Sequence, residues 1–182
     1  MNTRYTVGFR RKREGKTNYH KRIKLLSSRS NIIIFRKLSR TVIGQIVKFD
    51  VKGDIVLAGV NSRELEKYGW KLSRKNMAAA YLSGFLLAKK AASKKVGELV
   101  ANFGIINPSK GSSSYAFLKG AVDGGLKIAH EKEALAKDDR ARGMHIETFA
   151  AKNQEKTRFS KTPDAKKISK FFDETKKKIE SM

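Results

Sequence analysis

Residues 76–95 read NMAAAYLSGFLLAKKAASKK, and this stretch predicts the main helix of the protein. Large apolar side chains recur every four positions, at Met77, Tyr81 and Phe85. This spacing places them on one face of a helix. Asn76 is suited to cap the first turn, and Gly97 stands where a helix often ends in a left-handed residue. The small residue Gly84 is expected to let the helix lie close against a sheet.

Three strands are predicted before this helix. Ile32–Phe35 is a run of β-branched and aromatic residues, which is typical of a buried strand. Thr41–Phe49 and Ile55–Val60 read as the next two strands, joined by the glycine-containing turn DVKGD at Asp50–Asp54. Connections this short predict an antiparallel meander, and we expect a bulge at Gly44.

More helices and one further strand are predicted after the meander. Ser62 is suited to cap a short helix that ends at Gly69. A fourth strand at Glu98–Ile106 follows the long helix, and the order strand–helix–strand predicts a parallel pairing through a right-handed crossover. Tyr115–Gly125 reads as a second helix. The expected fold class is therefore α/β, with a mixed sheet of a three-strand antiparallel meander plus a parallel crossover strand, backed by helices.

The chain divides into three expected parts. Residues 1–30 form a basic arm, residues 31–150 the α/β core domain, and residues 151–182 a lysine-rich C-terminal helical extension. In this extension Pro163 can begin a helix. Its docking face is expected at Ile168, Phe171, Phe172 and Ile179.

The basic arm contains the segment RRKREGKTNYHKRIKLL at residues 10–26, with eight cations against the single acid Glu14. Such a run repels itself and becomes stable when a polyanion neutralises it. Thr17 and Tyr19 within it can bond phosphate and ribose or stack on an exposed base. The apolar residues that follow, among them Ile23, are expected to anchor the arm to a folded body. This pattern predicts RNA binding, and the alternative is a localisation signal or a solvated tail.

The overall charge supports a polyanionic partner. Lys and Arg number 41 and Asp and Glu 17, so the formal net charge is +24. Nucleic acid is the commonest partner of so basic a chain, and an anionic membrane surface is the second alternative. Cysteine is absent, which excludes disulfides and thiolate sites. No apolar run approaches the roughly 18 residues needed to span a bilayer, so we expect a cytoplasmic protein.

The sequence contains no recognisable motif of an enzyme site. The three histidines, His20, His130 and His145, lie in different segments, and no nucleophile elbow is present. His145 and Glu147 on one helix would point to different faces, so they do not begin a metal site. We therefore expect neither catalysis nor a cofactor or metal.

Five segments in a fixed order resemble one protein family. They are RRKREGKTNYHKRIKLL, SRELEKYGW, NMAAAYLSGFLLAKKA, NPSKGSSSYAFLKGAVDGGL and RARGMHI. Together they resemble the archaeal form of the L-eighteen family, the large-subunit ribosomal proteins that bind 5S ribosomal RNA, over Arg4 to Phe149. The resemblance implies a structural constituent of the large subunit that attaches 5S rRNA to large-subunit rRNA in the central protuberance. It also implies neighbouring ribosomal proteins as partners, and neither a membrane nor a small-molecule substrate.

The resemblance also implies which residues touch RNA. In the arm these are Arg10, Arg11, Arg13, Lys16, Thr17, Tyr19, Arg22 and Lys24. On the rim of the first hairpin they are Arg36, Lys37 and Arg40. We also expect contacts from Arg4, Lys12, Lys110, Arg140 and Arg142. The chain departs from the family at Thr41, where a histidine is common, and at Ser113 and Ser114, where a basic residue is usual.

A second hypothesis is a free-standing RNA chaperone or regulator with a non-specific basic surface. The two hypotheses differ in selectivity. A ribosomal protein of this family should prefer folded 5S RNA over bulk tRNA at moderate salt, whereas a non-specific chaperone should not discriminate between them.

Overall fold

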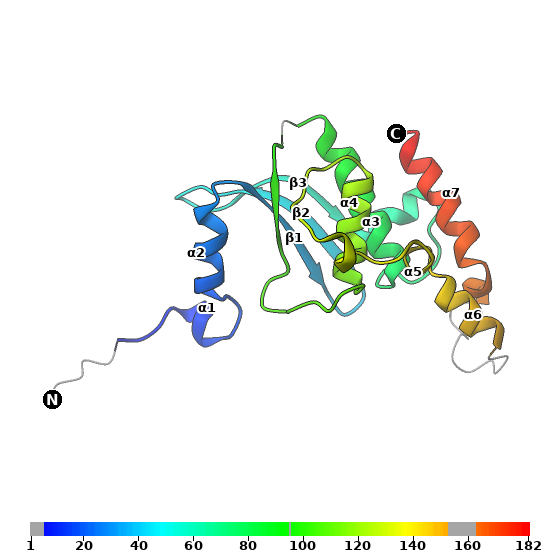
Figure 1. Cartoon of the computed structure of the whole chain (residues 1–182), viewed down its shortest axis with the longest axis horizontal. Coiled ribbons are helices and arrows are strands. Elements are labelled where there is room, and N and C mark those ends of the chain that lie inside the picture. Colours follow the sequence, from blue (N-terminus) through cyan, green and yellow to red (C-terminus); the bar gives the residue numbers. More distant parts are fainter. Residues whose placement is uncertain (1–5, 95, 153–162) are drawn as a thin grey trace.

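A computed structural model describes residues 6–94, 96–152 and 163–182 of the protein. One four-stranded sheet and the helices behind it form the body (Figure 1). The strands are β1 Asn31–Lys37, β2 Val42–Lys48, β3 Ile55–Asn61 and β4 Leu99–Asn102. The α-helices are α1 Arg10–Arg13, α2 Tyr19–Ser27, α3 Met77–Ala92, α4 Ser113–Asp123, α5 Asp138–Arg142, α6 Met144–Lys152 and α7 Ile168–Glu180. Short 3-10 helices span Ser62–Tyr68, Lys132–Ala134 and Pro163–Lys167.

The sheet has the strand order β3-β2-β1-β4. Strand β2 pairs antiparallel with both β1 and β3, and β4 pairs parallel with β1. The α/β fold with an antiparallel meander and a parallel crossover strand is therefore confirmed. The parallel pairing sets Asn102 beside Ile34, and this register later becomes part of the candidate site.

Helix α3 is the central element of the core, as its sequence predicts. The Asn76 side chain caps it by accepting a hydrogen bond from the Ala79 backbone N–H at 2.8 Å. The helix ends at Ala92, and Ser93, in a right-handed conformation, is its C-cap. The prediction that Gly97 ends the helix is wrong, because the chain leaves the helix several residues earlier.

Two glycines bring α3 and α4 into backbone contact. A Cβ atom on Gly84 would lie 2.0 Å from the carbonyl oxygen of Phe117, and a Cβ atom on Gly120 would lie 2.0 Å from that of Tyr81. Each glycine therefore faces the backbone of the other helix. Gly84 does allow a close approach, but the partner is α4 and not the sheet that the sequence suggested.

Gly44 also has a packing role in place of the predicted bulge. A Cβ atom there would lie 2.4 Å from Cζ of Phe117, so the missing side chain makes room for that ring. The irregularity of β2 lies between Ile46 and Val47, in its pairing with β3. A glycine in a strand interior marks either a bulge or a close approach, and here it marks the close approach.

The 3-10 helix after β3 begins differently from the prediction. Asn61 is its cap: the Asn61 side chain accepts from the Arg63 N–H at 3.0 Å, and the Asn61 backbone N–H donates to the Glu64 carboxylate at 3.0 Å. Ser62 is fully buried, and its hydroxyl accepts a hydrogen bond from the Val42 N–H at 2.9 Å. Ser62 thus ties the helix to β2, while Gly69 ends the helix in a left-handed conformation as predicted.

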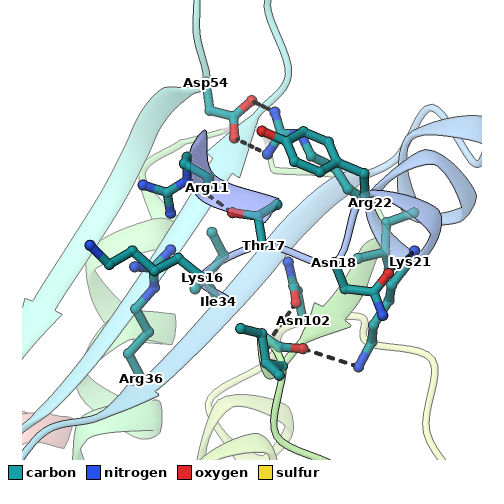
Figure 2. A pocket seen from close by; sticks show the side chains of 14 residues that line it. Arg11, Lys16, Thr17, Asn18, Lys21, Arg22, Ile34, Arg36, Asp54 and Asn102 are labelled. Atoms are coloured by element: carbon teal, nitrogen blue, oxygen red, sulfur yellow. Dashed lines mark hydrogen bonds and ion pairs between the residues drawn. The ribbon is translucent and has the colours of Figure 1, made fainter. Parts of the chain in front are cut away.

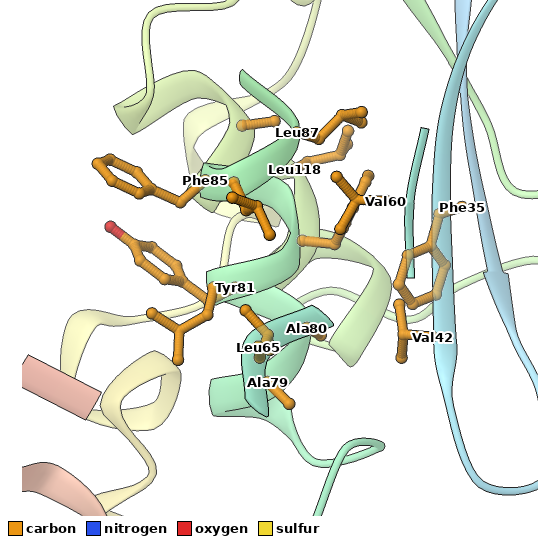
Figure 3. Packing of buried hydrophobic residues seen from close by; sticks show 14 of the residues in the cluster. Phe35, Val42, Val60, Leu65, Ala79, Ala80, Tyr81, Phe85, Leu87 and Leu118 are labelled. Carbon is orange, nitrogen blue, oxygen red and sulfur yellow. The ribbon is translucent and has the colours of Figure 1, made fainter. Parts of the chain in front are cut away.

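The core continues on the far side of α3. In Figure 3, Tyr81 and Phe85 point away from the strands, whereas Phe35 and Val42 lie on the sheet side. The ring of Tyr81 lies 5.2 Å from that of Phe172 on α7, between ring centroids. The predicted docking face of α7 is confirmed. Ile168, Phe172 and Ile179 are buried, and Phe171 is partly buried.

Candidate nucleic-acid interface

Helices α1 and α2 lie at one end of the molecule, away from α5, α6 and α7 (Figure 1). Helix α2 begins where the Asn18 side chain accepts a hydrogen bond from the Lys21 N–H at 3.0 Å. Leu25 and Leu26 are half-buried, so they anchor this helix to the body. Ile23 was expected to do the same, but 64% of it is exposed because it lies on the outer face of α2.

A concavity of about 500 Å³ opens between the arm and the sheet (Figure 2). Four separate segments line it: the arm, β1, the β2–β3 turn and the end of β4. The lining residues are Arg11, Lys16, Thr17, Asn18, Tyr19, Lys21, Arg22, Leu25, Ile34, Arg36, Asp54, Asn102, Gly104 and Ile105. Six of the predicted RNA contacts are thereby brought together.

Cations gather on one side of this concavity. Figure 2 shows Arg11, Lys16 and Arg36 on the same side, and all three are exposed. Lys16 pairs with Glu14 at 2.7 Å, and the Arg11 Nε donates to the Thr17 hydroxyl at 2.9 Å. Surface pairs of this kind are worth about 1 kcal/mol or less. These cations therefore remain available to phosphate.

Tyr19 stands at the start of α2 with its ring against Phe9. The ring centroids are 5.3 Å apart and the planes are tilted by 44°. Packing of Tyr19 against Ile23, one turn further along α2, is the alternative to a contact with RNA. The structure shows Phe9 as its aromatic neighbour, in a part of the arm where Phe9 itself is 71% exposed.

Arg22 and Lys21 hold α2 in place. The two terminal nitrogens of Arg22 donate to the Asp54 carboxylate at 3.0 and 2.8 Å. The hydrogen bond to Asp54 raises the pKa of Arg22, whose guanidinium is charged at physiological pH in any case. Lys21 Nζ donates to the carbonyl oxygen of Gly104, beyond β4, at 3.3 Å.

The other predicted contacts lie in several places. Arg10, Lys12, Arg13 and Lys24 are exposed on the arm, and Arg40 is exposed in the first hairpin. Lys37 donates to the Ser113 hydroxyl at 3.2 Å, and Lys110 pairs with Glu133 at 3.5 Å. Arg140 and Arg142 lie on α5 at the other end of the molecule, with Arg142 3.9 Å from Asp173. Arg4 lies outside the described residues.

Sequence reasoning missed Asp54, Asn102 and Gly104 as parts of this site. Asn102 lines the concavity because the parallel pairing sets it next to Ile34, and its side-chain oxygen accepts from the Gly104 N–H at 2.8 Å. A prediction of the register between β4 and β1 would have placed Asn102 in the site. Asp54 in the hairpin turn carried no signal of its own.

The described part of the chain gathers no set of metal ligands. Within residues 6–94, 96–152 and 163–182, no three His, Asp or Glu side chains meet as a metal site would require. Burial, followed by the nearby charge of Arg140, lowers the pKa of His145. None of the described helices combines the length and apolarity needed to cross a membrane.

Comparisons with known proteins find the family that the sequence segments resemble. Residues 3–100 match the family model described as "Ribosomal large subunit proteins 60S L5, and 50S L18". A "Large ribosomal subunit protein uL18" of Thermofilum pendens is 46% identical over 187 residues, covering 97% of this chain and 95% of the relative. The protein of the same name from Korarchaeum cryptofilum is 43% identical, covering 98% and 96%. The chain therefore belongs to the family of large-subunit ribosomal proteins 60S L5 and 50S L18.

Proposed function

We propose that this protein binds 5S ribosomal RNA through its arm and the neighbouring rim of the sheet, and helps attach that RNA to large-subunit rRNA in the central protuberance. Membership of the family makes it a structural protein of the large ribosomal subunit and not an enzyme. The finer assignment to 5S rRNA is the proposal.

One observation carries this proposal: Arg11 and Lys16 of the arm and Arg36 of β1, all exposed, lie together on one side of a single concavity. Phosphates of a folded RNA present regularly spaced anions to such a rim, and each contact releases counterions. Amide side chains inside the concavity, those of Asn18 and Asn102, can donate to ribose or base edges. The alternative of a solvated tail does not account for a concavity between the arm and the sheet.

The selectivity of binding tests the proposal. Folded 5S RNA from a related archaeon should compete for the protein much better than bulk tRNA in 0.15–0.2 M salt, because shape and spacing add to charge. Equal competition by tRNA would support the non-specific chaperone instead. The assay is a fluorescence competition with labelled 5S RNA and the full chain.

Tyr19 gives a first prediction for this site. If its ring stacks on a base or ribose, Tyr19→Ala should weaken binding by about 1–3 kcal/mol with little change in salt slope. Tyr19→Phe should bind almost normally, since it keeps the ring. Melting of the free variants is the control: a Tyr19→Ala protein that melts lower and binds normally would show that the ring serves only to pack on Phe9.

The residues on α5 belong to a different surface. Arg140 and Arg142 lie at the opposite end from the arm (Figure 1), so one short RNA segment cannot touch both sets. We propose that these arginines meet large-subunit rRNA while the arm holds 5S rRNA. Arg140→Ala with Arg142→Ala should then leave binding to isolated 5S RNA unchanged, and a loss of that affinity would refute the division.

A further inference from the structure

Arg22 differs from the other cations of the arm in the ion pair that it forms. Its guanidinium donates two hydrogen bonds to the Asp54 carboxylate, at 3.0 and 2.8 Å. Charge-assisted pairs with this two-pronged geometry are stronger and more directional than single contacts. Lys24, on the same helix, is exposed, and the described part of the chain offers its ammonium no ion-pair partner. The charge pattern of the arm and the family resemblance predict RNA contact for both residues alike.

The ion pair joins two elements that are distant in sequence. Arg22 is on α2, and Asp54 is in the turn between β2 and β3. One position earlier, Lys21 reaches the Gly104 carbonyl beyond β4. Because β3 and β4 are the two edges of the sheet, the helix is tied to connections at both of them.

The position of α2 determines the shape of the concavity. The helix carries Tyr19 and Leu25, which line the concavity. Its cap Asn18 directly follows Thr17, whose hydroxyl accepts the hydrogen bond from Arg11. A tilt of α2 would therefore move all these lining residues of the concavity relative to Arg36 on β1. The two N–H groups of Arg22 that bond Asp54 are unavailable to phosphate, and the other three N–H groups of the guanidinium remain.

We propose that Arg22 is a positioning residue, which with Asp54 latches α2 to the β2–β3 turn and so sets the arm against the sheet for RNA. The inference rests on the proposed RNA-binding function of the same site. It assigns Arg22 to the architecture of the site, whereas Lys24, Lys16 and Arg36 remain predicted direct contacts.

The latch can be tested without RNA. Asp54→Asn removes one carboxylate charge, and Asp50→Asn makes the same change in the same turn, where the Asp50 carboxylate accepts a hydrogen bond from the Lys52 N–H at 2.9 Å. We expect faster amide hydrogen exchange across α2 in Asp54→Asn and unchanged exchange in Asp50→Asn. Equal exchange in the two variants would overturn the latch.

Binding to 5S RNA supplies the second test, as a double-mutant cycle. Arg22→Ala and Asp54→Asn should each weaken binding by about three- to tenfold, and the double variant should be no weaker than either single one. The salt slope should stay unchanged for Arg22→Ala but fall by about 0.7–0.9 for Lys24→Ala. If Arg22 touches phosphate instead, its removal lowers the slope, and Asp54→Asn binds no worse than Asp50→Asn.

The two proposals fail in different ways. If the wild-type chain does not prefer 5S RNA to tRNA, the proposed function is wrong, yet the exchange result for α2 still decides whether the latch exists. If the wild type is selective and Asp54→Asn behaves as Asp50→Asn in both assays, only the latch is wrong.

Discussion

Gly84→Ala is expected to lower the free energy of unfolding by about 3 kcal/mol or more. The added Cβ would lie 2.0 Å from the Phe117 carbonyl oxygen on α4, and this atom belongs to the backbone of a buried helix. Relief requires the two helices to separate, which loosens the packing around Phe117, a fully buried residue. Overpacking of cores typically costs about 1–3 kcal/mol, and a clash with backbone exceeds that range.

The matched control is Gly59→Ala on β3. A Cβ atom there meets only Gln45 and Val56 side-chain atoms at 3.9 Å, which is ordinary contact. We expect its effect to stay within about 0.5 kcal/mol. Urea unfolding of both variants checks this, and equal midpoints for Gly84→Ala and Gly59→Ala would contradict the close packing of α3 on α4.

The second large effect concerns the arm. Replacing Arg10, Arg11 and Arg13 by alanine should reduce the slope of log K against log salt by about 2–3 units if each arginine neutralises one phosphate. Near 0.15 M salt this corresponds to roughly a hundredfold loss of affinity. The arginines lie on α1, which has no buried residues, so the stability of the free protein should hardly change.

The control removes the same charge from the other end of the protein. Lys166, Lys167 and Lys170 are exposed near and on α7, and their replacement by alanine also lowers the net charge by three. This variant should bind 5S RNA nearly as the wild type does. Equal losses in the two triple variants would mean that binding follows total charge and not a defined surface.

Much of the fold follows from local patterns in the sequence. The apolar spacing from Met77 to Phe85 and the cap at Asn76 define α3, and the β-branched runs define the meander. The positions that misled are those where tertiary packing decides. The sequence suggested a bulge at Gly44 and contact with the sheet at Gly84. Each glycine instead faces a group of α4 that lies more than 30 residues away along the chain.

The candidate site was predictable only in part. The density of cations in residues 10–24 indicated the arm, because charge is visible without any knowledge of contacts. The concavity was not predictable, since it forms where the arm, the turn at Asp54 and the end of β4 meet. The ion pair of Arg22 likewise depends on a partner 32 residues away, and no local sequence pattern predicts that partner.

Lysine reactivity in the complex with 5S RNA tests the central claim most directly. Acetylation followed by mass spectrometry should show Lys12, Lys16 and Lys24 protected by the RNA, because they lie on the surface assigned to it. Lys166, Lys167 and Lys170, at the opposite end of the protein, should react as in the free chain. Protection of the C-terminal lysines together with full reactivity of Lys16 and Lys24 would contradict the account.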